Sequence, residues 1–178
     1  MVDDLLDSGA IATGKLSVTL QPVDLGALAA MVADVRKLAE HKSLQLHALK
    51  ISPCVVMADE SRMKQVIWNL LTNAVKFTET GSIDISVKAV DGHAEVTIAD
   101  TGRGIAPAAL PLVFDRFLQI APQSSGRVGG LGLGLWLARH IVTSHRGTIA
   151  VASEGRGFGA TFTGTLPLAR APAGSHRE

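Results

Sequence analysis

Three clusters of glycine between residues 102 and 159 constrain the fold more than any other feature of this 178-residue sequence. The clusters are Gly102 and Gly104; Gly129, Gly130, Gly132 and Gly134; and Gly155, Gly157 and Gly159. Glycine is costly inside regular structure, so such clusters are favoured where the backbone needs a positive φ or must approach a ligand closely. The middle cluster opens a predicted helix, and the exposed N–H groups of a helix N-terminus bind phosphate. Together the clusters indicate a nucleotide site.

The composition fits one ordinary domain. Hydrophobic residues make up 47% of the chain and charged residues 19%, which is enough apolar material for a core. The net charge is +1 and the basic residues are scattered, unlike the basic stripe of a nucleic-acid binder. No apolar run approaches the roughly 18 residues that span a bilayer, and the acidic start at residues 1–6 does not fit a signal peptide. We therefore expect a cytoplasmic domain that contacts neither nucleic acid nor membrane, with its single cysteine, Cys54, buried.

Apolar residues recur with helical spacing in four segments. The first is residues 1–14, closed by Gly14. Asp24 and Asp59 are predicted N-caps of the next two helices, the first of which carries apolar positions up to residue 38. The last helix is expected from about 131 to 145. The inward face predicted for the Asp59 helix consists of Met63, Val66, Ile67, Leu70, Leu71, Ala74 and Val75.

Alternating apolar residues predict the strands. Short strands are expected at 16–20, 44–49 and 54–57, a hairpin at 83–98 that turns at Asp91-Gly92, and further strands at 148–152 and 161–166. Residues 106–130 are rich in Gly, Pro and Ser and are predicted to form a lid, and residues 169–178 a linker or tail. The sum is an α+β fold, a two-layer α/β sandwich. Its sheet is predicted to be mixed, mostly antiparallel and about five-stranded, with three main helices on one face.

Two common phosphate-binding motifs do not fit the sequence. Residues 9–15 nearly match a Walker A loop, but Leu16 stands where a Ser or Thr must bind magnesium, and no buried strand precedes the loop. No G-x-G-x-x-G follows a strand with an acidic residue about 20 positions later, so a dinucleotide-binding fold is disfavoured.

Five further segments, in order, resemble the motifs of sensor histidine kinases. The segments are Asn69-Leu70-Leu71-Thr72-Asn73-Ala74-Val75-Lys76-Phe77 (N box), Asp100-Thr101-Gly102-Arg103-Gly104-Ile105 (first glycine box), Phe114-Asp115-Arg116-Phe117 (F box), Gly130-Leu131-Gly132-Leu133-Gly134-Leu135 (second glycine box) and Gly157-Phe158-Gly159-Ala160-Thr161-Phe162 (closing motif). The resemblance covers residues 16–168. It implies a Bergerat-type ATP-binding catalytic domain at residues 15–168.

The resemblance implies roles for the N box. Asn69 and Asn73 are four residues apart and project from one helical face, and amide oxygens suit Mg²⁺, which keeps several waters and bridges phosphates. Asn73 is the expected magnesium ligand and Asn69 its support. Lys76, one turn further on, is expected to contact phosphate.

The resemblance places the rest of ATP on the later motifs. The Asp100 carboxylate is expected to accept a hydrogen bond from the adenine amine, where guanine has an oxygen, with Thr161 assisting through a hydroxyl or a water. The backbone is expected to approach the adenine base at Gly102 and Gly104, and Ile105 and Leu133 to form the apolar walls around the base. Gly130, Gly132 and Gly134 are expected to lie next to the phosphates. Arg116 is ranked ahead of Gln119 and Arg127 as the contact of the γ-phosphate. Phe114 and Phe117 are expected to anchor the lid, or one of them to enter the core.

Related ATPases keep a catalytic glutamate one turn before the magnesium asparagine. Asn69 occupies that position here and cannot accept a proton, and Glu60 lies nine residues earlier. The site is therefore expected to hold ATP without fast hydrolysis and to present its γ-phosphate to another nucleophile.

The resemblance also implies partners. The acceptor would be a histidine on a dimerisation and histidine-phosphotransfer domain. Residues 1–14 are expected to be the C-terminal end of the second helix of that domain. A response regulator receiver domain would then receive the phosphate from the histidine. None of the six histidines has the acceptor context. Leu131 replaces the usual Thr or Ser, which leaves open a nucleotide-binding regulatory module with degenerate activity. A serine kinase of the anti-sigma type is disfavoured by the helical residues 1–14.

Overall fold

The computed structural model describes residues 7, 9, 11, 16–29, 32–117 and 132–169. Beside a 3₁₀ helix at Pro107–Leu112, the helices are α2 (Leu25–Leu28), α3 (Val32–Glu40), α4 (Glu60–Phe77) and α5 (Gly134–Ser144). The strands are β1 (Gln21–Asp24), β2 (Gln45–Ile51), β3 (Val55–Ala58), β4 (Ser82–Val90), β5 (His93–Asp100), β6 (Thr148–Ala152) and β7 (Ala160–Pro167).

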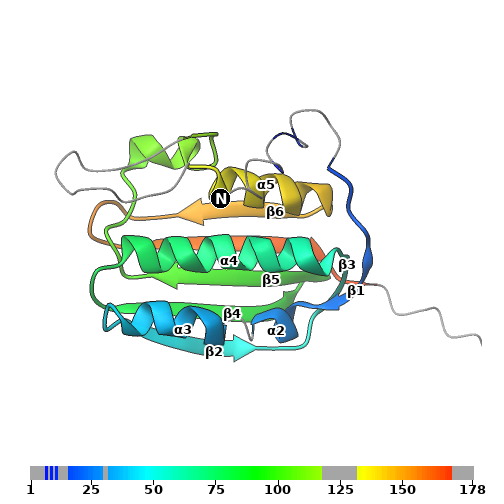
Figure 1. The fold of residues 1–178 in the computed structure, drawn as a ribbon, viewed down its shortest axis with the longest axis horizontal. Helices are drawn as coiled ribbons and strands as arrows, with labels where there is room; N and C mark the ends of the chain where they lie inside the picture. Colours follow the sequence, from blue (N-terminus) through cyan, green and yellow to red (C-terminus); the bar gives the residue numbers. More distant parts are fainter. Residues whose placement is uncertain are drawn as a thin grey trace, which may run out of the picture.

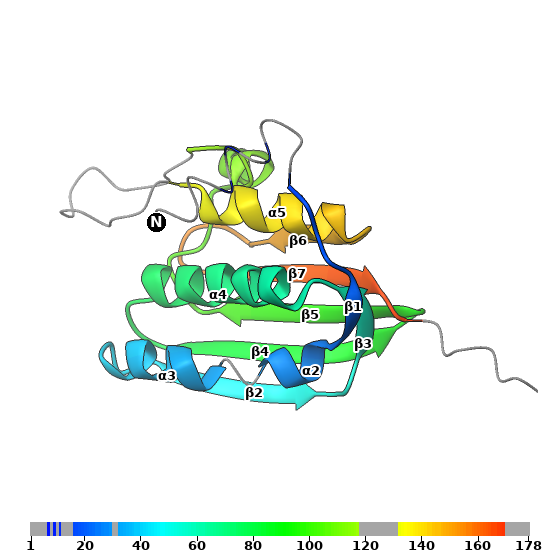
Figure 2. The ribbon, with the colours of Figure 1, turned by 45° about the vertical axis from the view of Figure 1, so that its right-hand side comes forward.

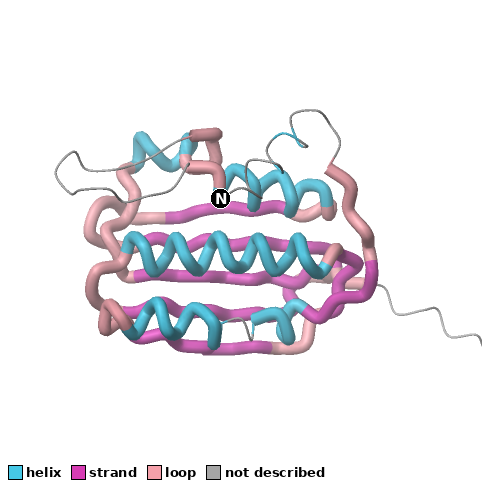
Figure 3. Tube along the Cα trace, viewed as in Figure 1, coloured by secondary structure: helices cyan, strands magenta, loops and turns pink. Residues whose placement is uncertain are grey.

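The strands form one large sheet in the order β2-β4-β5-β7-β6 and a small one of β1 and β3. In the large sheet β2 and β4 are parallel, and the other neighbours are antiparallel. Helices α3, α4 and α5 lie side by side across one face of this sheet (Figures 1 and 2). The tube view shows the two layers, helices in front of strands (Figure 3). The predicted α+β sandwich, with its mixed five-stranded sheet, is confirmed.

The core lies between the two layers and follows from residue alternation. On β4, Ile83, Ile85 and Val87 are buried while the residues between them are half-exposed, because successive strand side chains point to opposite faces. On α4 the seven residues predicted to face inward are all buried. The Asp59 carboxylate caps this helix by accepting from the amide of Arg62 at 3.1 Å, as expected from the sequence.

The strand predicted at 16–20 is wrong, since the pairing residues are those of β1. In the antiparallel pair, Gln21 lies opposite Ala58, the last residue of β3. Residues before Gln21 therefore run past the end of their partner strand. The amide of Thr19 instead donates to the carboxylate of Asp59 at 3.0 Å.

The helix boundaries also differ from the predictions. The helix predicted after Asp24 is two helices, α2 and α3. The first is held against the start of β3, because Asp24 accepts from the amides of both Gly26 (2.9 Å) and Cys54 (2.8 Å). The helix expected from 131 begins at Gly134, since Gly132 has a φ of +68°, outside the helical region. Cys54 is buried, as predicted.

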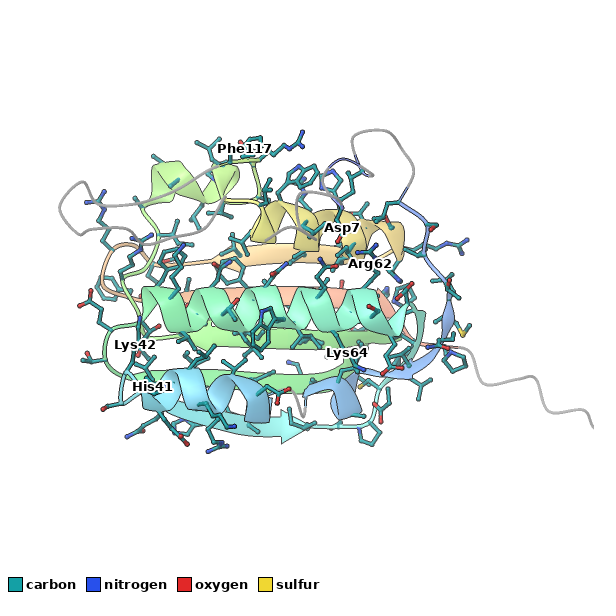
Figure 4. All side chains as sticks on the ribbon, viewed as in Figure 1. Asp7, His41, Lys42, Arg62, Lys64 and Phe117 are labelled. Atoms are coloured by element: carbon teal, nitrogen blue, oxygen red, sulfur yellow. The ribbon has the colours of Figure 1, made fainter. Side chains whose placement is uncertain are left out.

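The C-terminal end of α4, where the predicted site begins, is held by Lys42 (Figure 4). Its ammonium donates to the carbonyls of Val75 (2.8 Å), Lys76 (3.2 Å) and Thr78 (3.3 Å). These carbonyls have no partner within the helix, and a cation at a helix C-terminus also complements the helix dipole. Within the described residues no helix is both long and apolar enough to cross a bilayer.

Candidate functional site

The first and third glycine clusters pack against each other through their backbones. The amide of Gly159 donates to the carbonyl of Gly102 at 3.0 Å, and that of Gly157 donates to the carbonyl of Arg103 at 2.7 Å. Gly159 has a φ of +68°, and a Cβ there would collide with the carbonyl of Asp100. Gly159 is therefore required by close backbone contact at the end of β5.

Asp100 ends β5 beside this contact and is half-buried. Its carboxylate accepts from the amide of Gly102 at 2.8 Å. Burial raises the pKa of the Asp100 carboxyl above its ordinary value, while the amides of Gly102 and Ala160 and the nearby Thr78 hydroxyl act in the opposite direction. A carboxylate has about four lone-pair sites, so Asp100 can accept a further hydrogen bond from a ligand.

Thr161 does not share the face of the sheet on which Asp100 lies. Ala160 is the residue opposite Asp100 on β7, and Thr161 lies opposite Ala99. The side chain of Thr161 therefore points to the face away from the helices, as the alternating burial of β7 also indicates. The sequence could not show this, because it depends on the register between two distant strands.

The residue that does bring a hydroxyl to Asp100 is Thr78, which no sequence motif had singled out. Thr78 follows α4 directly and is fully buried. A Cβ placed on Gly102 would lie 2.8 Å from both the Thr78 hydroxyl and an Asp100 carboxylate oxygen, and it would collide with the carbonyl of Phe77. The end of the N box and the first glycine box thus meet at Gly102.

Asn69 links α4 to the second glycine box. Its amide nitrogen donates to the carbonyl of Gly134, the first residue of α5, at 3.2 Å. A Cβ on Gly134 would touch the Asn69 side chain at 3.5 Å. Asn73 lies one turn further along α4 and is half-buried. The two asparagines therefore share a helical face toward the start of α5, as their spacing predicted.

Two cations lie over the ring of Phe77. The ammonium of Lys76 is 4.9 Å and the guanidinium of Arg103 is 4.1 Å from the ring centroid. Burial lowers the pKa of Lys76, and the charge of Arg103 lowers it further. Like charges held together in partial burial favour a bound anion nearby. Arg103 was not predicted, since an arginine in a glycine-rich loop carries no sequence signal of its own.

The F box lies at the start of α5. Phe114 is buried and packs edge-on against Phe162, with ring centroids 6.3 Å apart, so it is the phenylalanine that enters the core. Phe117 is 57% exposed (Figure 4), and its amide donates to the carbonyl of Gly132 at 3.1 Å. The guanidinium of Arg116 stacks 5.0 Å from the ring centroid of Trp136 of α5.

The remaining predicted residues fall into two groups. Ile105 is half-buried and its amide donates to the Ser153 hydroxyl at 3.0 Å, while Leu133 is buried before α5. Ser153 also donates to the carbonyl of Gly159 at 2.6 Å, so it fastens the two glycine loops together. The residues that lie outside the described part of the chain are Gln119, Arg127, Gly129, Gly130 and Leu131.

Comparison with known proteins identifies the family of the chain. Residues 58–170 match the family model described as Histidine kinase-, DNA gyrase B-, and HSP90-like ATPase. The chain is 34% identical over 202 residues to hybrid signal transduction histidine kinase D of Dictyostelium discoideum, covering 94% of this chain and 13% of that protein. It is 33% identical over 169 residues to sensor histidine kinase CusS of Escherichia coli (strain K12), and the match covers 94% of this chain and 35% of CusS.

Solved structures agree. The crystal structure of full-length ShkA in complex with AMPPNP matches with a TM-score of 0.82 and 33% identity, covering 97% of this chain and 36% of ShkA. The chain thus spans between 13% and 36% of the length of these three proteins.

Proposed function

Since the chain belongs to the Histidine kinase-, DNA gyrase B-, and HSP90-like ATPase family, we propose that it is the catalytic domain of a two-component sensor histidine kinase. It presents the γ-phosphate of Mg-ATP to a histidine on a dimerisation and histidine-phosphotransfer domain. The observation that carries this proposal is the meeting of three motifs at one place. The end of α4 and the loop after β5 touch at Gly102, and the closing glycines pack on the same loop.

Adenine is recognised by Asp100. Its ionised carboxylate accepts a hydrogen bond from the exocyclic amine, and guanine is rejected because its oxygen at that position cannot donate. Gly102 and Gly104 allow the backbone to approach the base, and Ile105 and Leu133 supply apolar walls. ADP has the same base and is therefore also a ligand.

The phosphates lie between α4 and the start of α5. Lys76 neutralises their charge as a point charge, and the amides of Gly132 and Gly134 lie at the N-terminus of α5, which favours anions. Arg116 is the candidate for the γ-phosphate, because it sits over Trp136 near the beginning of that helix.

Magnesium is the ion that the donor set fits. The available ligand is the neutral amide oxygen of Asn73, and a hard oxygen ligand with waters completing the shell suits Mg²⁺. Asn69 keeps its own amide on Gly134 and so orients the helical face that carries Asn73. When bound with ATP, the ion supplies neutralisation of the phosphate charge.

The phosphoacceptor domain is the proposed intramolecular partner, and a receiver domain the next one. Residues 1–14 are proposed to end the second helix of the acceptor domain. Of these, Asp7 makes an ion pair with Arg62 of α4 at 2.6 Å and accepts from Gln65 at 2.9 Å (Figure 4). This contact of Asp7 with α4, the helix that carries the N box, supports the proposal.

We expect the isolated chain to bind Mg-ATP and ADP. We expect it to release phosphate far more slowly than about 1 s⁻¹, a rate at which ordinary enzymes turn over. The reason is that Asn69 replaces a general base and uses its amide on Gly134. Calorimetry and a phosphate-release assay test both parts. Asn69→Glu should raise turnover little, because it also removes the donor to Gly134. Turnover of about 1 s⁻¹ by the unmodified chain would instead identify a true ATPase, and failure to bind ATP would end the proposal.

We also expect ATP binding to weaken as the pH falls through the raised pKa of Asp100. The native pKa of Asp100 is raised above its ordinary value of 3.8, so the carboxylate that accepts the adenine amine is lost as the pH falls through the raised value. The contribution of Asp100 to folding stability depends on pH in the opposite direction. Between 3.8 and the raised pKa the native state binds more protons than the unfolded state, so the contribution of Asp100 to stability decreases as the pH rises.

The measurement is the difference between the unmodified chain and Asp100→Asn, in ATP affinity and melting temperature, across this pH range. Subtraction removes the titration of other groups such as Asp7 and Asp59. Identical pH profiles for the two proteins would contradict the prediction.

A further inference from the structure

The hydroxyl of Thr78 is a buried polar group outside the set of residues assigned to ATP binding. Thr78 is 0% exposed, and within the described part of the chain its hydroxyl meets no partner at hydrogen-bond geometry. It lies near enough to Asp100 to favour the charged carboxylate. A buried hydroxyl without a hydrogen bond lowers the stability of the folded state, so a threonine at this position requires a structural or functional explanation.

The position of the hydroxyl is set by the backbone around it. The amide of Thr78 donates to the carbonyl of Ala74 at 3.1 Å, and its carbonyl accepts from Lys42 at 3.3 Å. On the other side Gly102 leaves no room for a larger residue, because a methyl group there would lie 2.8 Å from both the hydroxyl and the carboxylate. The hydroxyl therefore lies beside the Asp100 carboxylate, and its proton is free to rotate toward it.

The neighbouring strand supplies no hydroxyl for Asp100. The residue opposite Asp100 on β7 is Ala160, and Thr161 points to the other face of the sheet. Among these residues, only Thr78 brings a hydroxyl to the helix side of the sheet, where Asp100 lies.

We propose that Thr78 is a positioning residue for adenine recognition. Its hydroxyl donates to the Asp100 carboxylate, which in turn accepts the exocyclic amine of adenine. The hydroxyl thereby keeps the carboxylate charged and oriented for the base. This inference rests on the proposed function, because it needs adenine to bind at Asp100.

The test compares two nucleotides on four proteins. Binding of Mg-ATP and of purine riboside triphosphate, which lacks the amine, is measured by calorimetry for the unmodified chain, Thr78→Val, Thr78→Ser and Asp100→Asn. Valine keeps the shape and removes the hydroxyl, while serine keeps the hydroxyl. We expect Thr78→Val to bind ATP about tenfold more weakly and the analogue unchanged, and Thr78→Ser to restore ATP affinity to within about twofold.

Further readouts separate this role from a structural one. Thr78→Val should melt close to the unmodified chain, because valine keeps the shape of the buried side chain, and in the double variant with Asp100→Asn it should cost no further affinity. If Thr78→Val does not fold, Thr78→Ala carries the same comparison. Equal losses for both nucleotides, no loss for ATP, or no rescue by serine would overturn the inference. ATP binding by the unmodified chain would leave the proposed function standing in each case, whereas its absence would overturn both.

Discussion

Gly159→Ala is expected to lower the melting temperature by about 10 °C and to abolish ATP binding, whereas Gly157→Ala should be milder. Both glycines have positive φ, +68° and +87°, so both variants incur the left-handed penalty of about 1–2 kcal/mol. Only at Gly159 does the added Cβ collide with the backbone of Asp100, and nothing lies within 4 Å of the Cβ position at Gly157.

The collision cannot be relieved by a side chain, because the obstacle is a main-chain carbonyl. Overpacking of this kind costs roughly 1–3 kcal/mol or more, and each kcal/mol shifts the melting temperature by about 2–4 °C in a domain of this size. Displacing the end of β5 also displaces the Asp100 carboxylate. Thermal unfolding and calorimetry check both effects. Equal melting temperatures and equal ATP affinities for the two variants would show that the glycine contact does not build the site.

Asp100→Asn is expected to weaken ATP binding by roughly ten- to a hundredfold, because a charge-assisted hydrogen bond contributes about 1.5–3 kcal/mol. The preference for ATP over GTP should shrink as well, since an asparagine amide can donate to the oxygen of guanine. Calorimetry with both nucleotides measures these effects.

Asp84→Asn is the matched control. Asp84 lies on the same sheet, with its carboxylate 2.8 Å from the ring nitrogen of His47, and it pairs with Ala99, on the face away from the helices. It should leave ATP affinity unchanged. Equal affinity of the unmodified chain for ATP and GTP, or an equal loss in both variants, would contradict the role of Asp100 in reading adenine.

Elements whose signals are local were predictable. The helix α4 follows from the Asp59 cap and a continuous apolar face, and β4 and β5 follow from alternation around Asp91-Gly92. The strand predicted at 16–20 shows the same alternation, but alternation does not supply a pairing partner, and β3 ends opposite Gln21. A local sequence pattern is sufficient to predict a strand only where a partner strand is available to pair with it.

The residues of the candidate site also divide into those that the sequence predicts and those that depend on long-range contacts. The asparagine spacing on α4 can be read from the sequence, because a helix fixes which residues share a face. The hydroxyl at Asp100 cannot, because Thr161 and Thr78 are distinguished by the register of β7 against β5 and by the contact of Gly102 with the end of α4. Both are long-range contacts, as is the bond from Asn69 to Gly134.

The most direct measurement of the central claim uses ATP labelled at the γ-phosphate. A histidine-bearing dimerisation domain of a sensor histidine kinase is fused ahead of this chain and incubated with labelled Mg-ATP. Label should appear on the acceptor domain as acid-labile phosphohistidine. It should be absent when the acceptor histidine is replaced, and strongly reduced in Asn73→Ala. Label that remains on ATP or is released only as inorganic phosphate, while the chain binds ATP normally, would contradict a domain built to hand its γ-phosphate to histidine.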